Sequence, residues 1–131
     1  MEEELLYRQP PHSPEAEYSV LGSMLVNSHC IPQVIEALKA EDFYLEQNQL
    51  FFRTIHTMFS HAKVIDPVTA LEQLRLNSDL DEAASRNYVM QLLDVNPPAA
   101  HVPAYIETVT HFSLTRPVAQ ALEDVPGMVQ P

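Results

Sequence analysis

Glycine is almost absent from this chain of 131 residues, which contains only Gly22 and Gly127. Phosphate-cradling loops and dinucleotide-binding turns need several glycines close together, because their backbones must approach the phosphates closely. Two glycines at such distant positions cannot form either structure. The sequence therefore excludes a nucleotide site of these kinds.

Cysteine is equally scarce, since Cys30 stands alone and no disulfide can form within the chain. A single cysteine without a disulfide is typical of proteins in a reducing compartment. The opening residues Met1-Glu2-Glu3-Glu4 lack the basic and apolar pattern of a signal peptide. No apolar run approaches the length of about 18 residues that a membrane span needs. We expect a cytoplasmic protein that does not contact membranes.

Cationic side chains are few, with seven Lys and Arg against eighteen Asp and Glu and a net charge of −11. The seven are spread along the sequence without a cluster. Affinity for a phosphate backbone comes mainly from cationic side chains that release counterions. Direct DNA binding by this chain alone is therefore not expected.

Residue patterns for catalysis or metal binding are also missing. The closest histidines, His56 and His61, do not have the i, i+4 spacing of a helical metal pair. No G-x-S-x-G motif occurs, and Cys30 has only His29 as a local partner. We assign no catalytic residue, metal or cofactor, and we predict that this chain is not an enzyme.

Hydrophobic residues make up 46% of the chain, and their spacing predicts an all-α fold. We expect a compact orthogonal array of about six short helices with the start of a C-terminal helical hairpin. Ser13 and Asp66 are predicted N-caps, each followed by a proline at the first helical position. The helices are expected to begin after Ser13 and to cover about residues 31–39, 46–61, 66–76, 81–95 and 102–114.

Prolines and weak patterns mark the predicted limits of the domain. Residues 1–12 are interpreted as a flexible N-terminal arm and residues 13–114 as the helical domain. Pro117 is expected to stop or kink the last helix. Residues 115–131 are interpreted as a weakly ordered tail or a truncated hairpin or linker. Between the second and third helices, Phe43 lies in a connector that is expected to bury its aromatic side chains.

Glu17 has an unusual position in the first helix. On a helical wheel it shares one face with four apolar residues, Val20, Leu21, Met24 and Leu25. If this face is buried, Glu17 needs a hydrogen-bond partner, because an unpaired buried carboxylate is costly. The alternative is that the first turn frays outward and Glu17 is solvated.

Gly22 lies inside the same helix, where glycine costs about 1 kcal/mol relative to alanine. Its side of the wheel carries mostly small residues: Ala16, Ser19, Ser23 and Val26. One interpretation is a central helix that packs on two sides, and the other is a glycine tolerated on an exposed face. Close packing predicts that Gly22→Leu destabilises more than Gly22→Ala, which would stabilise if helix propensity alone mattered.

Four stretches, taken together and in order, resemble the N-terminal domain of the bacterial replicative DNA helicase, the DnaB family. They match the family patterns E-A-E-x-S-V-L-G-x-x-L, D-F-Y-x-x-x-H-x-x-I-F, I-D-x-V-T and V-P-x-A-A-N-x-x-x-Y. In this chain they are Glu15 to Leu25, Glu41 to Phe52, Ile65 to Thr69 and Val95 to Tyr105. Asn48 stands where the family often has histidine, and His101 where it often has asparagine.

The resemblance implies a non-catalytic collar domain of a hexameric helicase whose ATP-dependent motor lies elsewhere. Such a domain would mediate self-assembly and dock primase or a helicase loader in DNA replication. It would meet DNA only through the full-length ring. The alternative is a free-standing adaptor or phage-type protein with the same fold that binds the replication machinery.

The last helix carries the residues that we assign to self-association: Tyr105, Ile106, Val109 and Phe112. For Ile106 and Val109, ordinary packing in the domain core is the alternative. A structural role is predicted for four further residues: Glu17, Gly22, Phe43 and Asp66.

Overall fold

The structure, a computed structural model, describes residues 12–95 and 97–129, with side chains as far as Arg116. Within these residues the regular elements are α-helices and short 3-10 turns, without a strand. The α-helices are α2 (Pro14–Val26), α3 (Ile31–Ala37), α4 (Glu46–Ser60), α5 (Pro67–Asn77), α6 (Glu82–Val95) and α7 (Val102–Val129). The 3-10 turns are η1 (Ser28–Cys30), η2 (Ala40–Asp42) and η3 (Ala99–His101). The predicted all-α fold is confirmed.

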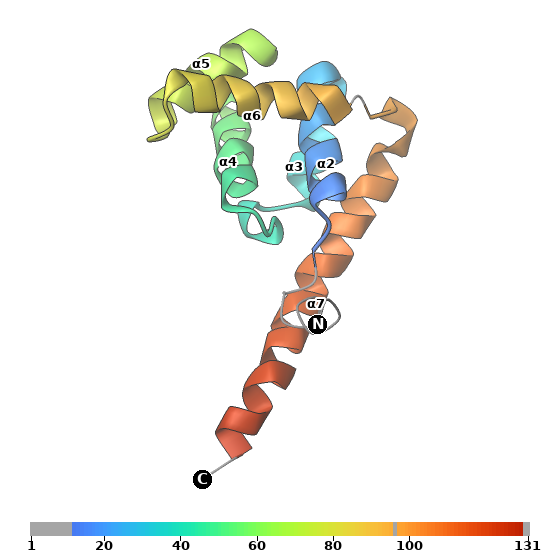
Figure 1. Cartoon of the computed structure of the whole chain (residues 1–131). Helices are drawn as coiled ribbons and strands as arrows, with labels where there is room; N and C mark the ends of the chain where they lie inside the picture. The colour runs from blue at the N-terminus through green and yellow to red at the C-terminus, as the bar shows by residue number, and fades with distance from the viewer. Residues whose placement is uncertain (1–11, 96, 130–131) are drawn as a thin grey trace.

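Helix α2 is the centre of the packing, and α4, α6 and α7 all contact it (Figure 1). The helix begins as predicted, because the Ser13 hydroxyl oxygen accepts a hydrogen bond from the Ala16 N–H at 3.2 Å and Pro14 follows the cap. Its buried residues include the apolar face and most of the small-residue face, on which Val26 alone is exposed, at 51%. The interpretation of a central helix packed on two sides is therefore confirmed.

Gly22 marks the closest approach between α2 and α6. A methyl group added at its Cα would lie 2.7 Å from the backbone carbonyl oxygen of Leu92 on α6. Real Cβ atoms do not come this close to a carbonyl oxygen, and a backbone atom cannot rotate away. Helix propensity alone therefore does not decide the effect of alanine at this position, and the exposed-face alternative is wrong.

The other predicted structural residues also occupy buried or capping positions. Phe43 is fully buried, and its ring packs against that of Phe52 with a centroid distance of 5.2 Å. Asp66 caps α5: its carboxylate accepts from the Thr69 N–H at 2.8 Å, and its own N–H donates to the Thr69 hydroxyl at 2.9 Å. This reciprocal pair is a capping box, which fixes where α5 begins.

Helices α4 and α5 each leave part of their apolar side chains exposed. On α4, Phe59 is 40% exposed, whereas Phe52 is buried against Phe43. On α5, Val68 is 76% exposed, whereas Ala70 and Leu74 are buried. Periodicity identifies an apolar side of a helix, but the neighbouring elements decide which edge of it they cover.

The expected end of the last helix at about residue 114 is wrong, because α7 runs to Val129 through Pro117. Proline removes one N–H and so leaves the Ser113 carbonyl without its helical donor. The turn before Pro117 is nevertheless held from outside the helix, since Ser113 and Arg116 both bond to Asp42. The predicted hairpin start corresponds to α7, which leaves the helical body in Figure 1.

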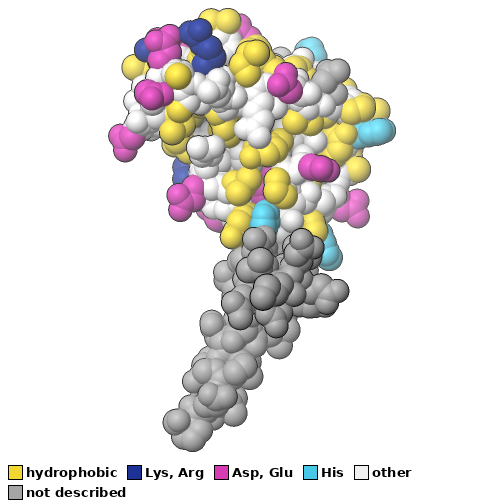
Figure 2. Space-filling model, in the orientation of Figure 1, with side chains coloured by type: hydrophobic (Ala, Val, Ile, Leu, Met, Phe, Trp, Pro, Cys, Tyr) yellow, Lys and Arg dark blue, Asp and Glu magenta, His cyan; other side chains and the backbone are white. Residues whose placement is uncertain are grey.

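The space-filling view shows how the charges are distributed on one face. Acidic side chains are spread over the helical body, whereas Lys and Arg appear at only a few places (Figure 2). None of the helices within the described ranges combines the length and the apolar content that a membrane crossing requires. The predicted N-terminal arm, residues 1–12, lies outside the described residues except for His12, whose ring stacks on Tyr44 at 4.0 Å.

Candidate functional site

A buried polar network surrounds Glu17, which is only 2% exposed. Its carboxylate accepts hydrogen bonds from the backbone N–H of Tyr44 at 2.8 Å and of Leu45 at 3.3 Å. The Asn48 side-chain amide donates a third bond, at 2.9 Å. The prediction that Glu17 points inward and has a partner is confirmed, and the solvated alternative is wrong. The carboxylate supplies acceptors for the N–H groups just before and at the start of α4, where the helix has no side-chain cap.

Asn48 and Tyr88 extend this network to α6. Asn48 is fully buried, and its Oδ1 accepts a hydrogen bond from the Tyr88 hydroxyl at 2.6 Å. The Tyr88 ring meets Phe51 edge-on at a centroid distance of 5.5 Å. One continuous polar path therefore joins α2, α4 and α6 through the core. The sequence contained a signal for Asn48, a polar residue on the same face as Phe51 and Phe52, but its role was not predicted.

Tyr88→Phe is expected to lower the free energy of unfolding by about 1–2 kcal/mol, because Asn48 Oδ1 loses its donor in a buried place. Urea denaturation near neutral pH measures this difference. The matched control is Tyr105→Phe, since Tyr105 lies half-exposed on α7. An unchanged midpoint for Tyr88→Phe would show that the hydroxyl contributes nothing to stability.

The same tyrosine gives the stability a pH dependence. Burial, and secondarily the negative charges of Tyr18 and Glu17, raise the pKa of Tyr88 well above its ordinary value of 10.0. In the unfolded chain the hydroxyl ionises at the ordinary pKa, so the stabilisation present below about pH 10 is lost as the pH rises beyond it. The wild type should therefore exceed Tyr88→Phe in free energy of unfolding by less at about pH 11 than at about pH 8.

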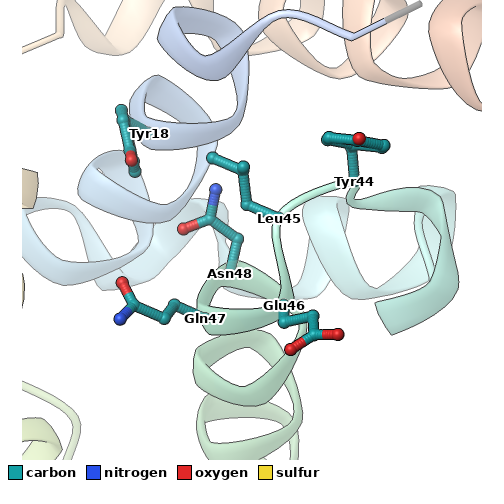
Figure 3. A pocket seen from close by; sticks show the side chains of 6 residues that line it. All are labelled: Tyr18, Tyr44, Leu45, Glu46, Gln47 and Asn48. Carbon is teal, nitrogen blue, oxygen red and sulfur yellow. The ribbon is translucent and has the colours of Figure 1, made fainter. Parts of the chain in front are cut away.

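A pocket opens beside this network at the first turn of α4. It is lined by Tyr18, Tyr44, Leu45, Glu46, Gln47 and Asn48. Figure 3 shows Tyr18 and Tyr44 on opposite sides of that turn, with Leu45 and Asn48 between them. The lining offers aromatic rings, amides and one carboxylate, which do not form a general acid–base pair or a nucleophile. No group of His, Cys, Asp and Glu side chains among the residues that the structure describes could hold a metal ion.

A second polar cluster fixes the middle of α7 to the η2 turn. One Asp42 carboxylate oxygen accepts from the Ser113 hydroxyl at 2.6 Å, and the other accepts from the Lys39 N–H at 2.7 Å. The Arg116 guanidinium donates to the Asp42 carbonyl and lies 5.7 Å from the centroid of the Tyr44 ring. Because the N–H of Tyr44 binds Glu17, this anchor is continuous with the network of α2. The anchor was not predicted, and Arg116 lies beyond the expected end of the domain.

The four residues assigned to self-association divide into two pairs. Ile106 and Val109 are 8% and 2% exposed and belong to the core of the chain itself, as the alternative for them stated. Tyr105 and Phe112 are half-buried on α7 and remain accessible. The role of this second pair in self-association stays a prediction.

The comparisons with known proteins agree with the resemblance drawn from the four sequence stretches. Residues 9–111 match the model of the DnaB-like helicase N terminal domain. A replicative DNA helicase DnaB from Leifsonia xyli subsp. xyli is 30% identical over 114 residues, which cover 87% of this chain and 25% of the relative. The corresponding protein of Rhodothermus marinus is 33% identical over 109 residues, which cover 83% of this chain and 12% of the relative.

A solved structure supports the same assignment. The N-terminal domain of DnaB helicase from Mycobacterium tuberculosis is similar with a TM-score of 0.82 and 30% sequence identity, covering 91% of this chain and 86% of that one. The chain spans a quarter or less of the length of the two helicases named above. Since the family model covers most of the sequence and the fold agrees, the chain belongs to the DnaB-like helicase N-terminal domain family.

Proposed function

We propose that this chain is the non-catalytic N-terminal collar of a hexameric replicative helicase in the cytoplasm. In this role it mediates self-assembly and docks primase or a helicase loader. The proposal is carried by α7, which is anchored to the domain at Ser113 and Arg116 and then continues beyond the helical body (Figure 1). An anchored helix that extends past its own domain is suited to pack against another copy.

Charge supports a role in protein binding rather than in DNA binding. The net charge of −11 repels a phosphate backbone, and Arg75 and Arg86 are already paired with carboxylates on their own helices. The longer helicases to which this chain is similar are expected to supply the motor and the contact with DNA. The collar would then contribute contacts between subunits and with accessory proteins.

Self-association is tested by light scattering of the full chain from low to high micromolar concentration. The average mass is expected to rise with concentration. Phe112→Ala should reduce this rise, because it removes a half-buried aromatic ring from α7. Glu107→Ala, at an exposed position of the same helix, should leave it unchanged. A strictly monomeric wild type at the highest concentration would contradict self-assembly by this domain.

Partner binding is tested separately with the full chain as bait and the purified cognate primase or loader as prey. Retention of either protein at micromolar concentration is expected. A chain that retains neither would contradict docking by the isolated domain.

A further inference from the structure

A groove between α3, η2 and α4 combines an apolar floor with a cationic rim. The floor is formed by Leu38, Ala40 and Phe52, each buried, with the half-buried Ile35 at its side. The same side chains pack inward: the three buried ones belong to the hydrophobic core, and Ile35 packs against it. Leu38, Ala40 and Phe52 are already covered, so the apolar surface that an occupant could remove from water here belongs mainly to Ile35.

The rim carries three exposed basic side chains: Lys39, Arg53 and His56. The cations are spread along the sequence, but the fold brings Lys39 and Arg53 to the same groove. Within the described part of the chain, neither of these two side chains takes part in an ion pair, whereas Arg75 and Arg86 do. Glu41 is the one carboxylate in the lining.

This balance of charge differs from that of the neighbouring surface. The pocket at the first turn of α4 carries Glu46 without a cation, and a pocket next to Leu50 carries both Glu46 and Asp79. In a chain of net charge −11, a groove in which Lys39 and Arg53 outnumber the single carboxylate of Glu41 is a local exception. Its potential attracts an anionic partner that the rest of the surface repels.

We propose that this groove binds an acidic, leucine-bearing segment of a partner protein. The segment would place aliphatic side chains against the half-buried Ile35, above the covered floor, and carboxylates near Lys39 and Arg53. A nucleic acid fits less well, because the apolar floor offers nothing to a phosphate backbone and the whole chain is strongly acidic. The inference goes beyond the proposed function, since it specifies the chemistry of the segment and the face that receives it.

The groove also adjoins the anchor of α7. Lys39 and Glu41 belong to the same short stretch as Asp42, which accepts the bonds from Ser113 and Arg116. A bound segment would therefore lie next to the turn that fixes α7. This position connects the groove with the part of the domain assigned to self-assembly.

The probe is a fluorescein-labelled synthetic peptide of alternating glutamate and leucine pairs, titrated with the full chain and followed by fluorescence anisotropy. We expect saturable binding that weakens with added salt. Lys39→Glu/Arg53→Glu should weaken it by about ten-fold, since two charge-assisted contacts become repulsive. Lys63→Glu/Arg75→Glu changes the net charge equally at another place and should weaken binding less than about two-fold. All four side chains are exposed, and melting curves verify that both variants fold.

Three outcomes would overturn the proposal. They are no binding of the peptide, an equal loss of affinity in both double variants, or equal binding of a peptide with serine in place of leucine. A single-stranded oligonucleotide that binds more tightly than the peptide would instead assign the groove to nucleic acid. Chemical-shift changes confined to the backbone around Lys39, Arg53 and His56 would support the groove directly. These results do not depend on primase capture, so the inference and the proposed function can fail independently.

Discussion

Gly22→Ala should lower the free energy of unfolding by about 2–3 kcal/mol, although alanine is the better helix former. The added methyl group would lie 2.7 Å from the Leu92 carbonyl oxygen, so α2 and α6 must move apart. Such a displacement disturbs packing along both helices, because the interior is close-packed. For a domain of this size the melting temperature should fall by about 10 °C, which differential scanning calorimetry measures.

The matched series for this prediction separates steric conflict from helix propensity. Gly22→Leu should destabilise more than Gly22→Ala, because a larger side chain forces a larger separation of the helices. Ala83→Leu adds a side chain of similar size at an exposed position of α6 and should change stability little. A melting temperature of Gly22→Ala equal to or above that of the wild type would contradict the close approach.

Glu17→Ala is expected to have the larger effect, a loss of about 3–5 kcal/mol in the free energy of unfolding. The substitution leaves the Tyr44 and Leu45 N–H groups and the Asn48 amide without their acceptor in a buried place. Since domains are usually stable by about 5–15 kcal/mol, this variant would lose much of its stability. Urea denaturation monitored by circular dichroism gives the value if the variant folds.

Glu17→Gln keeps the shape of the side chain and provides a milder test. Both carboxylate oxygens accept, so the new amide NH₂ must face at least one donor. The free energy of unfolding of Glu17→Gln should lie between the values of the wild type and of Glu17→Ala. Glu15→Gln removes an exposed carboxylate from the same helical turn and should change stability by less than about 0.5 kcal/mol. Equal effects at positions 15 and 17 would contradict the buried network.

Local chemistry explains why much of the fold could be predicted from the sequence. Ser13 and Asp66 predict helix starts, because the side chain of an N-cap residue binds a backbone N–H only three residues later. The inward direction of Glu17 followed from its place on the wheel, which needs only the helix itself. The partners of Glu17 could not be predicted, because the donors lie 27 to 31 residues away in the sequence. No local sequence pattern specifies hydrogen bonds between residues so far apart.

The incorrect prediction for the last helix and the features that were not predicted have the same cause. The cost of Pro117 was judged from the helix alone, whereas the bonds from Ser113 and Arg116 to Asp42 come from an element more than seventy residues away. Gly22 could be placed on a small-residue face, but the carbonyl that faces it belongs to Leu92. The cationic groove was missed because Lys39 and Arg53 become neighbours only when α3, η2 and α4 fold together.

The central position of α2 has a consequence for synthesis on the ribosome. Translation delivers Pro14–Val26 first among the described helices, and its partners α6 and α7 emerge much later, at Glu82–Val95 and Val102–Val129. Until then Val20, Leu21 and Met24, which are fully buried in the finished domain, have no cover from these helices. Their exposure on a nascent chain is an aggregation hazard of the kind that chaperones counter. Native folding of this domain is therefore completed only near the end of its translation.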